Sequence, residues 1–306
     1  MVDARAIHDA VAAWYARNAR VLPWRGIADP YAILVSEIML QQTQVERVVP
    51  KYHAFLDAFP TLQALADAQP AGVIRIWAGM GYNGRAVRLH NLAREVVERY
   101  SGELPRTADE LRKLPGIGPY TAAAVASFAF GEPVAVLDTN IYRVLSRTVH
   151  GVDAPSREAI HPLAESLLPQ QDSPITPADW HQALMDIGAT LCTSRQPRCM
   201  LCPLRPRCAA APYLQSGGDP ALAESSVPYA PRQSRFQGSA RYFRGRIVDY
   251  LREQPDAGVE EHTLEGVISD AETASGAPCP VSLPDLLAAL ERDGLIRRDS
   301  GRVRLP

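Results

Sequence analysis

The sequence lacks the features that would place the protein in a membrane or outside the cell. No run of apolar residues is long enough to cross a bilayer. The first twenty residues carry charges within a helical pattern and lack the apolar core of a signal peptide. Alternation of apolar and polar residues, which is typical of strands, is scarce over residues 1–213. These absences exclude a membrane-spanning or mainly β protein, and we expect a cytoplasmic one.

Lysine is nearly absent as well. Lys51 and Lys113 are the only lysines, so arginine supplies nearly all of the 32 basic residues. Arginine suits bidentate contacts with phosphate, but the formal net charge of −2 shows no excess of positive charge. A nucleic-acid partner must therefore be argued from individual sites. With 46% hydrophobic and 22% charged residues, the 306-residue chain can form two or three domains with a sizeable core.

Helical periodicity dominates the first two thirds of the chain. Apolar residues recur at spacings of three and four, as at Ile7, Val11 and Trp14, and prolines punctuate the later segments. Asp29 followed by Pro30 predicts a helix start, with the aspartate as the N-cap. We therefore expect residues 1–213 to form an all-α bundle of short helices.

The last third of the chain has a different pattern. Residues 214–236 are rich in glycine, serine, proline and alanine without periodicity, which predicts a linker. After it, residues 239–253, residues 261–271 and a segment capped by Ser282 predict three helices. Residues 296–306 predict a β-hairpin that turns at residues 299–301. Three helices followed by a hairpin indicate a small winged-helix-like domain over residues 237–306.

Four of the five cysteines lie close together, and they form the strongest motif in the sequence. Cys192, Cys199, Cys202 and Cys208 are separated by 6, 2 and 5 residues, whereas Cys279 is remote. Clustered cysteines in a cytosolic chain are more often metal ligands than disulfide partners. A structural zinc site is one interpretation, but zinc usually shows two C-x-x-C pairs and this loop has one. The spacing resembles the [4Fe–4S] loop of the endonuclease III and adenine glycosylase superfamily, which favours an iron–sulfur cluster.

Residues 108–129 predict two helices joined by a sharp turn at residues 115–118. This is a helix-hairpin-helix pattern, in which Gly116 and Gly118 let the backbone turn tightly and approach another chain. The amides at the start of the second helix, as far as Thr121, would point outward, where the helix dipole favours an anion such as a DNA phosphate. A plain turn between two helices is the alternative, but the cysteine motif downstream favours DNA binding.

Glu37 lies in the apolar segment of residues 31–40, where Ile33, Leu34 and Leu40 would share its helical face. A carboxylate on an apolar face is costly, and desolvation raises the pKa of a carboxyl group. A general acid that works at neutral pH needs such a raised pKa. A glutamate at the helix edge that extends into solvent is the alternative, and sequence alone favours it.

Asp138 follows the apolar segment PVAVL and precedes TNIYRVLSR, so we predict that it caps the next helix. A second role is compatible with the first, provided that the carboxylate is exposed at the mouth of a cleft. Cleavage of an N-glycosidic bond passes through an oxocarbenium-like transition state. One group then protonates the leaving base while an anionic group stabilises the sugar cation, and Asp138 would be that anion.

Seven segments in the order LPWR, SEIMLQQTQV, GMGYNGRAVRLH, LPGIGPYTAAA, VLDTNIYRVLSR, HQALMDIGA and the cysteine loop resemble the A/G-mismatch adenine DNA glycosylase (MutY) family. They cover about residues 20–210. The resemblance implies a helix-hairpin-helix glycosylase fold, with a six-helix barrel over 29–134 and an iron–sulfur domain formed by 1–28 and 135–213. The active site would lie between these two domains. We accordingly expect a nucleoid-associated monomer that binds a [4Fe–4S] cluster and acts on double-stranded DNA containing a mismatch or lesion.

The resemblance also implies roles for individual residues. Glu37 matches the acid that protonates N7 of adenine, and Asp138 matches the carboxylate that stabilises the sugar cation. Gln41 and Gln42 match glutamines beside the lesion pair, one of which fills the space left in the base stack. Tyr82 matches an aromatic wedge beside the opposite base. A wedge suits base flipping, because unstacking costs a few kcal/mol and an inserted side chain lowers that cost.

Four further positions follow from the same resemblance. Trp24, Arg25 and Gln182 fall where the family's adenine pocket lies. Bifunctional relatives that resemble endonuclease III carry a lysine at the position of Tyr120, and this lysine forms a Schiff base with the sugar. Tyrosine cannot do so, and we expect a monofunctional enzyme that leaves an abasic site without cutting the strand.

Two features depart from the family pattern and keep alternatives open. Residues 81–85 read GYNGR where the family commonly has GYYAR, which is similar to the thymine-mismatch branch. The C-terminal tail of about 70 residues is too short for the Nudix-like domain with which many members read 8-oxoguanine. Removal of adenine opposite G or 8-oxoguanine is the expected activity. A thymine or uracil mismatch glycosylase and a non-catalytic DNA-binding damage sensor are the alternatives.

Overall fold

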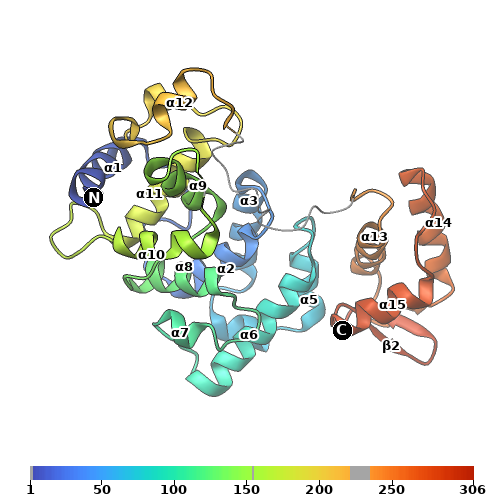
Figure 1. The fold of residues 1–306 in the computed structure, drawn as a ribbon. Helices are drawn as coiled ribbons and strands as arrows, with labels where there is room; N and C mark the ends of the chain where they lie inside the picture. Colours follow the sequence, from blue (N-terminus) through green and yellow to red (C-terminus); the bar gives the residue numbers. More distant parts are fainter. Residues whose placement is uncertain (1–2, 154, 221–234) are drawn as a thin grey trace. The chain divides into compact units, whose positions relative to one another are not determined.

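A computed structural model of the chain describes residues 3–153, 155–220 and 235–306, which are mainly helical (Figure 1). Most of the linker predicted at 214–236 lies outside the described residues, although residues 214 and 215 are helical. Within the described ranges, no helix combines the length and the apolar character needed to cross a membrane.

Residues 3–220 form helices joined by short loops, and they contain no strand among their described positions. The helices are α1 (Ala4–Asn18), α2 (Pro30–Leu40), α3 (Val45–Ala58), α4 (Leu62–Asp67), α5 (Pro70–Ile76), α6 (Gly84–Tyr100), α7 (Ala108–Leu111), α8 (Pro119–Phe130), α9 (Thr139–Val149), α10 (Arg157–Ser166), α11 (Pro177–Thr190) and α12 (Ala211–Gln215), with short 3-10 turns η1 (Cys199–Leu201) and η2 (Arg205–Arg207). The predicted all-α character of this region is confirmed.

Side-chain caps fix several of the helix starts. Asp29 accepts from the backbone N–H of Tyr31 at 2.9 Å, and Pro30 begins α2, which confirms the predicted start. Thr61 and Thr176 cap α4 and α11 in the same way. An N-cap of this kind stabilises a helix by about 1 kcal/mol, because it satisfies an amide that has no partner within the helix.

The described residues pack into two compact units, each of which has its own core. Among these residues, the first unit comprises 3–33, 105–113, 117–153 and 155–220, and the second comprises 34–104, 114–116 and 235–306. The domain boundaries predicted from the sequence follow the family pattern rather than these packing units, and they remain predictions.

In the first unit, α1 packs against α11, and α11 packs against α9. Their apolar faces share one core that contains Val11, Ile141 and Ile187, each of which is 0% exposed. The ring of His8 contacts Trp180 edge-on, with the ring centroids 4.9 Å apart. This core supports both the start of α9, where Asp138 lies, and the loop that carries the cysteines.

In the second unit, α6 packs against α4 and α5. Trp77, at the C-terminal end of α5, is fully buried and contacts Phe55 edge-on with the ring centroids 5.8 Å apart. The loop between α5 and α6 therefore begins at a rigid aromatic contact and ends at the first turn of α6.

The C-terminal module, residues 235–306, belongs to the second unit and has a winged-helix-like order of elements. It contains α13 (Ala240–Arg252), β1 (Val259–Glu260), α14 (Thr263–Ser275), α15 (Leu283–Arg292), β2 (Arg297–Asp299) and β3 (Arg302–Arg304). The three predicted helices and the hairpin are confirmed, and Ser300 and Gly301 form its turn with φ of +49° and +78°. The strand β1, which pairs with β3, was not expected, because two residues are too few to show alternation.

Candidate active site and cysteine loop

Glu37 is buried near the C-terminal end of α2. Only 5% of the residue is exposed, and residues 31–39 of the helix are all buried. The prediction that Glu37 extends from the helix edge into solvent, which sequence alone favoured, is therefore wrong. The reason is that both faces of α2 are covered, so the helix has no solvated edge at this point. Burial in such a helix favours the uncharged, proton-carrying form of a carboxyl group.

The two loops predicted to contact the lesion pair have strained backbones. Gln42, in the turn after α2, has φ of +56°, and Tyr82, in the turn before α6, has φ of +45°. Side chains other than glycine seldom adopt such angles, which cost about 1–3 kcal/mol each and concentrate at functional sites. Tyr82 is also 44% exposed, as a wedge residue requires, whereas Gln41 is half-buried.

Arg85 joins these two loops, and sequence reasoning missed it. The residue is 2% exposed although it lies in the first turn of α6. Its Nη1 donates to the backbone carbonyls of Ile38, Met39 and Gln41 at 3.1, 2.9 and 2.5 Å. Its Nη2 donates to Thr43 Oγ1 and to the carbonyls of Met80 and Gly81 at 3.0, 3.1 and 3.2 Å.

The burial of Arg85 disfavours its positive charge, but its contacts hold two turns together. Burial lowers the pKa of its guanidinium to about 10, and the nearby charge of Arg88 acts in the same direction. The group nevertheless remains charged at neutral pH. It also lies over the rings of Trp77 and Tyr82, with its central carbon 5.3 and 5.5 Å from their centroids. One cation therefore fixes both the turn after α2 and the turn that carries Tyr82.

The predicted helix-hairpin-helix motif is formed by α7, a tight turn and α8. Gly116 has φ of +78°, and a Cβ at this position would lie only 3.1 Å from Cδ of Arg88. Gly118 caps α8, and a Cβ there would meet nothing within 4 Å, so this side of the turn is open. Tyr120 is half-buried and Thr121 is 3% exposed. A contribution of Thr121 to DNA binding would therefore come from its backbone amide.

Asp138 caps α9, as predicted. Its carboxylate accepts from the backbone N–H of Ile141 at 2.7 Å and from Nδ2 of Asn140 at 2.9 Å. Burial raises the pKa of Asp138 above its usual value, against these hydrogen bonds and the positive charge of Arg143, which lower it. The side chain is half-buried rather than exposed, so its negative charge is costly in the protein alone.

A buried histidine supports the segment that leads to Asp138. His181 on α11 is 2% exposed, and its Nε2 accepts from the backbone N–H of Val136 at 3.2 Å. Its Nδ1 therefore carries the proton and lies 3.3 Å from Oγ of Ser127. Burial lowers the pKa of His181 to about 4, which keeps the ring neutral at physiological pH. Protonation would remove the acceptor that holds Val136.

The residues assigned to the adenine pocket lie on or beside one face of α11. Arg25 donates from Nη1 and Nη2 to the carboxylate of Asp186 at 2.6 and 2.8 Å, and Arg20 also pairs with it. Burial would raise the pKa of Asp186, but its hydrogen bonds and the charges of the two arginines hold the pKa below its usual value. One turn earlier on α11, Gln182 accepts from the hydroxyl of Tyr15 at 2.9 Å.

Asp186 was not identified from the sequence, although it lies in the segment HQALMDIGA. It is 0% exposed and orders Arg25, and Trp24, next to Arg25, is 7% exposed. A helical spacing of four from Gln182 is the signal that could have placed Asp186 on the same face. The structure thus brings Arg25 and Gln182 to one side of α11, with Asp186 as the anchor between them.

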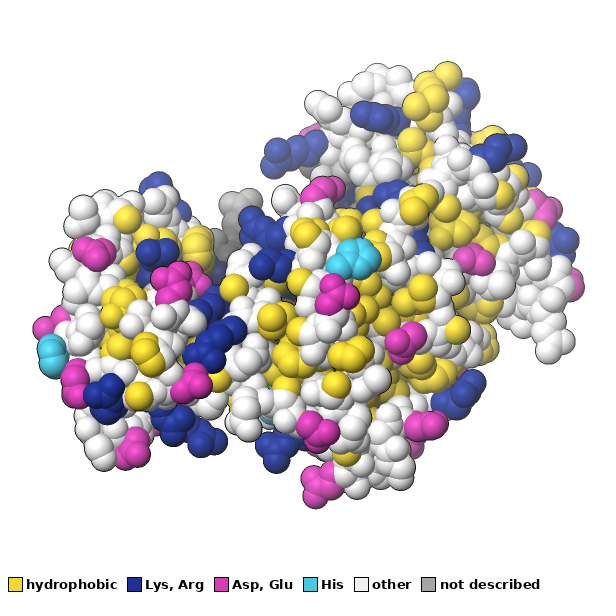
Figure 2. All heavy atoms as spheres, turned by 180° about the vertical axis from the view of Figure 1, so that it is seen from behind, with side chains coloured by type: hydrophobic (Ala, Val, Ile, Leu, Met, Phe, Trp, Pro, Cys, Tyr) yellow, Lys and Arg dark blue, Asp and Glu magenta, His cyan; other side chains and the backbone are white. Residues whose placement is uncertain are grey.

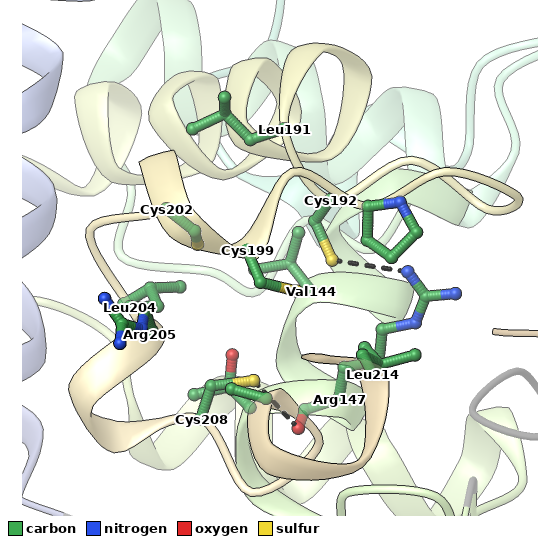
Figure 3. Close-up of a pocket in the computed structure, with 13 residues that line it drawn as sticks. Val144, Arg147, Leu191, Cys192, Cys199, Cys202, Leu204, Arg205, Cys208 and Leu214 are labelled. Atoms are coloured by element: carbon green, nitrogen blue, oxygen red, sulfur yellow. Dashed lines mark hydrogen bonds between the residues drawn. The ribbon is translucent and has the colours of Figure 1, made fainter. Parts of the chain in front are cut away.

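The four clustered cysteines line one cavity next to α9 (Figure 3). Burial raises the pKa of Cys202 to about 12, and the neighbouring thiols add to the shift. Burial also raises the pKa values of Cys199 and Cys208. Among the described residues, no three Cys, His, Asp or Glu side chains converge closely enough to hold a single metal ion.

Two arginines one turn apart on α9 hold the cysteine loop. Arg147 is 0% exposed, and it donates to the carbonyls of Thr193 and Ser194 at 2.8 and 3.0 Å. Its Nη1 also lies 3.6 Å from Sγ of Cys192 (Figure 3). Arg143 donates to the carbonyl of Cys192 at 2.6 Å. The loop is thus lined by positive charge on the side that faces α9.

No broad basic field covers the surface drawn in Figure 2. Basic and acidic side chains are interspersed there with apolar and uncharged ones, which agrees with the net charge of −2.

Known proteins are similar to this chain in sequence and in fold. Residues 35–170 match the family of HhH-GPD superfamily base excision DNA repair proteins. The adenine DNA glycosylase of Mycolicibacterium smegmatis is 44% identical over 243 residues, which are 78% of each chain. That of Mycobacterium tuberculosis is 40% identical over 280 residues, or 85% of this chain and 87% of the relative. A thermostable thymine-DNA glycosylase has a TM-score of 0.63 at 30% identity, covering 68% of this chain and 96% of that structure.

Proposed function

The chain belongs to the adenine DNA glycosylase family of base excision repair proteins, and we propose that it is a monofunctional enzyme that removes adenine paired with G or 8-oxoguanine. The observation that carries the proposal is the burial of Glu37. Glu37 is 5% exposed in an apolar helix, and such burial favours the proton-carrying form of a carboxyl group, which a general acid needs.

In the proposed reaction, the extruded adenine accepts a proton at N7 from the carboxyl group of Glu37. The bond between N9 and C1′ then breaks, and its electron pair leaves with the base. The sugar becomes an oxocarbenium-like cation, which the carboxylate of Asp138 stabilises. Water adds to C1′ and returns a proton to Glu37, so the products are free adenine and an abasic site.

The environment of Asp138 suits this role. Its carboxylate is held by Ile141 and Asn140, so it can meet the sugar without rearranging. Because burial makes its charge costly, a cation that develops nearby is stabilised more strongly than it would be by a solvated carboxylate. Tyr120 offers no amine for a Schiff base, which supports a monofunctional reaction.

We infer that a [4Fe–4S] cluster rather than a zinc ion occupies the cysteine loop. The 6-2-5 spacing of the cysteines and the single C-x-x-C pair support this, and the four thiols line one cavity. Arg143 and Arg147 supply positive charge beside these thiols, which would offset the negative charge of a thiolate cluster. Cys192, Cys199, Cys202 and Cys208 would hold the cluster, which would order the loop and transfer no electrons in the hydrolysis.

The same proposal gives DNA three contacts. The open turn at Gly118 would hold a phosphate at the N-terminus of α8. The exposed ring of Tyr82 would insert beside the opposite base, and Gln42, which is more exposed than Gln41, would fill the gap that the extruded adenine leaves. We propose a monomer bound to mismatched or damaged double-stranded DNA in the cytoplasm, at the nucleoid.

Single-turnover excision assays on duplexes with A·8-oxoG, A·G, T·G and U·G pairs test the proposal. We expect loss of adenine from the first two, with strand breaks only after alkali. Loss of thymine or uracil instead would favour the alternative to which Asn83 and Gly84 point. Loss of no base from any duplex would leave a non-catalytic damage sensor, and nicking without alkali would contradict the role of Tyr120. An absorbance shoulder near the visible–ultraviolet boundary, together with iron in elemental analysis, would separate the cluster from zinc.

A further inference from the structure

The core of the C-terminal module extends onto α5 and α6, which contribute a few of its apolar residues. Ile74 on α5 is 1% exposed and belongs to the same apolar cluster as Phe243 and Leu251 of α13. Val87 of α6 packs against this cluster as well. The backbone N–H of Ala71, in the first turn of α5, donates to the carbonyl of Pro306 at 3.0 Å. The module is therefore attached to the two helices that flank the Tyr82 loop.

Two arginines cross this contact in opposite directions. Arg252 at the end of α13 donates from Nε to the carbonyl of Ile74 at 3.0 Å and from Nη2 to Oδ1 of Asn83 at 2.9 Å. Arg75 on α5 donates in return to the carbonyl of Arg252 at 3.3 Å and to Asp256 at 2.7 Å. The side chain of Arg252 is 8% exposed, so water competes little for these bonds.

Asn83 occupies an unusual position for its side chain. It is the N-cap of α6, where asparagine ordinarily accepts from an amide of its own helix, yet it makes no such bond. Its amide oxygen accepts from Arg252 instead. Asn83 directly follows Tyr82, whose φ of +45° requires support from its surroundings. A single hydrogen bond thus connects the C-terminal module to the residue beside the wedge.

The module is poorly suited to read DNA by itself. In helix-turn-helix proteins, the second helix enters the major groove. Here the exposed positions at the ends of α15 include the acidic Asp285 and Glu291 beside the basic Arg292, so they offer phosphates no net positive charge. In the hairpin, Arg298 and Arg302 are paired with Glu261 and Glu260 at 2.8 Å each. These charges favour a role within the protein over a role in DNA contact.

We propose that Arg252 is a positioning residue through which the C-terminal module holds Asn83 and thereby orients Tyr82 for insertion into DNA. Arg85 on α6 fixes the same loop through the carbonyl of Gly81 at 3.2 Å. The loop is then held at Gly81 by Arg85 and at Asn83 by Arg252. The bond from Arg252 restrains a backbone that the Asn83-Gly84 pair would otherwise leave flexible. This inference rests on the proposed wedge role of Tyr82, but the structural link itself can be measured without DNA.

The test compares Arg252→Gln, Asn83→Ala and the double variant with wild type, all in the full chain. Arg298→Gln is the matched control, since it removes the ion pair between Arg298 of β2 and Glu261, which lies in the same module and does not involve Asn83. Asn83→Asp is the conservative variant, because it keeps an oxygen that can accept from Arg252. Thermal melts establish that each variant is folded, and Arg252→Lys replaces Arg252→Gln if the latter does not fold.

The first measurement is hydrogen exchange of the free protein over residues 78–84. We expect Arg252→Gln and Asn83→Ala each to speed exchange about fivefold, and the double variant to resemble either single one. For Asn83→Asp and Arg298→Gln, we expect these residues to exchange at the wild-type rate. Unchanged exchange in Arg252→Gln and Asn83→Ala, or an equal effect of Arg298→Gln, would overturn the link.

The second measurement is insertion of the wedge. Fluorescence of 2-aminopurine placed next to 8-oxoguanine in an A·8-oxoG duplex reports local unstacking in a stopped-flow instrument. Arg252→Gln and Asn83→Ala are expected to slow this step about three- to tenfold and to leave the pH profile of excision unchanged. Faster loop exchange with wild-type unstacking would overturn the positioning role. If wild type excises no adenine, the proposed function fails, whereas the exchange result still decides the structural link.

Discussion

Glu37 and Asp138 are both carboxyl groups that the protein shields from water, but it shields them in different ways. Glu37 lies within an apolar helix that is buried from residue 31 to residue 39. Asp138 lies at the start of a helix, where the N–H of Ile141, the amide of Asn140 and the charge of Arg143 face it. The difference teaches that a protein can remove a carboxyl group from water either within an apolar helix or at a helix start where hydrogen-bond donors hold it. In the proposed function, the first group is the acid and the second is the anion.

The largest expected effect follows from a substitution that removes the proposed acid of this pair, Glu37. Glu37→Gln keeps the size and burial of the side chain but removes the transferable proton. We expect the single-turnover rate of adenine excision to fall roughly 10³–10⁴-fold, because general acid catalysis is lost. Glu98→Gln, on the exposed face of α6, is the matched control and should retain the wild-type rate. A Glu37→Gln enzyme with full activity would show that another group protonates the base.

Asp186 extends the comparison to a carboxylate that two arginines neutralise. Asp186→Asn should destabilise the folded protein by about 3 kcal/mol, because it leaves Arg20 and Arg25 without their anionic partner in a buried site. Urea unfolding at pH 7.5 measures the change. If the variant were as stable as wild type, the ion pairs of Asp186 with Arg20 and Arg25 would position these side chains without stabilising the fold.

Asp138→Asn sharpens the comparison, because it separates catalysis from stability. Asparagine is as good an N-cap as aspartate, so α9 should keep its start. The excision rate is expected to fall about 100-fold, since the anion is lost. The midpoint of thermal unfolding at pH 7.5 should stay the same or rise, because the raised pKa shows that the charge of Asp138 is costly in the folded state. Asp138→Ala provides the contrast, with the cap lost and a lower midpoint.

The smallest effect concerns His181, which supports the segment before Asp138. Its folded-state pKa of about 4 lies below the ordinary value of 6.5, so the unfolded chain binds the additional proton between these values. The stability that neutral His181 contributes is therefore present above pH 6.5 and is lost as the pH falls toward 4. Between pH 7.5 and 5.5, wild type should lose about 1 kcal/mol more than His181→Gln in urea unfolding. Parallel curves for the two proteins would exclude this assignment.

The sequence predicted the elements of the fold because the signals for them are local. Asp29-Pro30, Ser239 and Ser282 cap helices within three residues, and the hairpin turn follows from Gly301, since glycine tolerates positive φ. The packing of the C-terminal module against α5 was not predictable. It depends on contacts between positions about 180 residues apart, which no periodicity records.

The candidate site was predictable only where a motif named it. The four cysteines surround one cavity, as their spacing indicated, and Asp138 caps a helix. Sequence alone favoured a solvated Glu37, because a pattern on one helix does not show what covers the other face. Arg85, Asp186 and Arg252 were missed for the same reason. An arginine or aspartate in a helix is usually solvated, and only the tertiary structure reveals the carbonyls and charges that bury it.

The core shared by α5, α6 and the C-terminal module has a consequence for how the chain folds during synthesis. Ile74 and Val87 leave the ribosome long before Phe243, so the second unit cannot complete its core until residues beyond 240 have been made. Until then, Ile74 and Val87 lack their apolar partners from the module, and exposed apolar side chains of this kind favour chaperone binding. The first unit faces no such delay, because its core is complete once the cysteine loop has emerged.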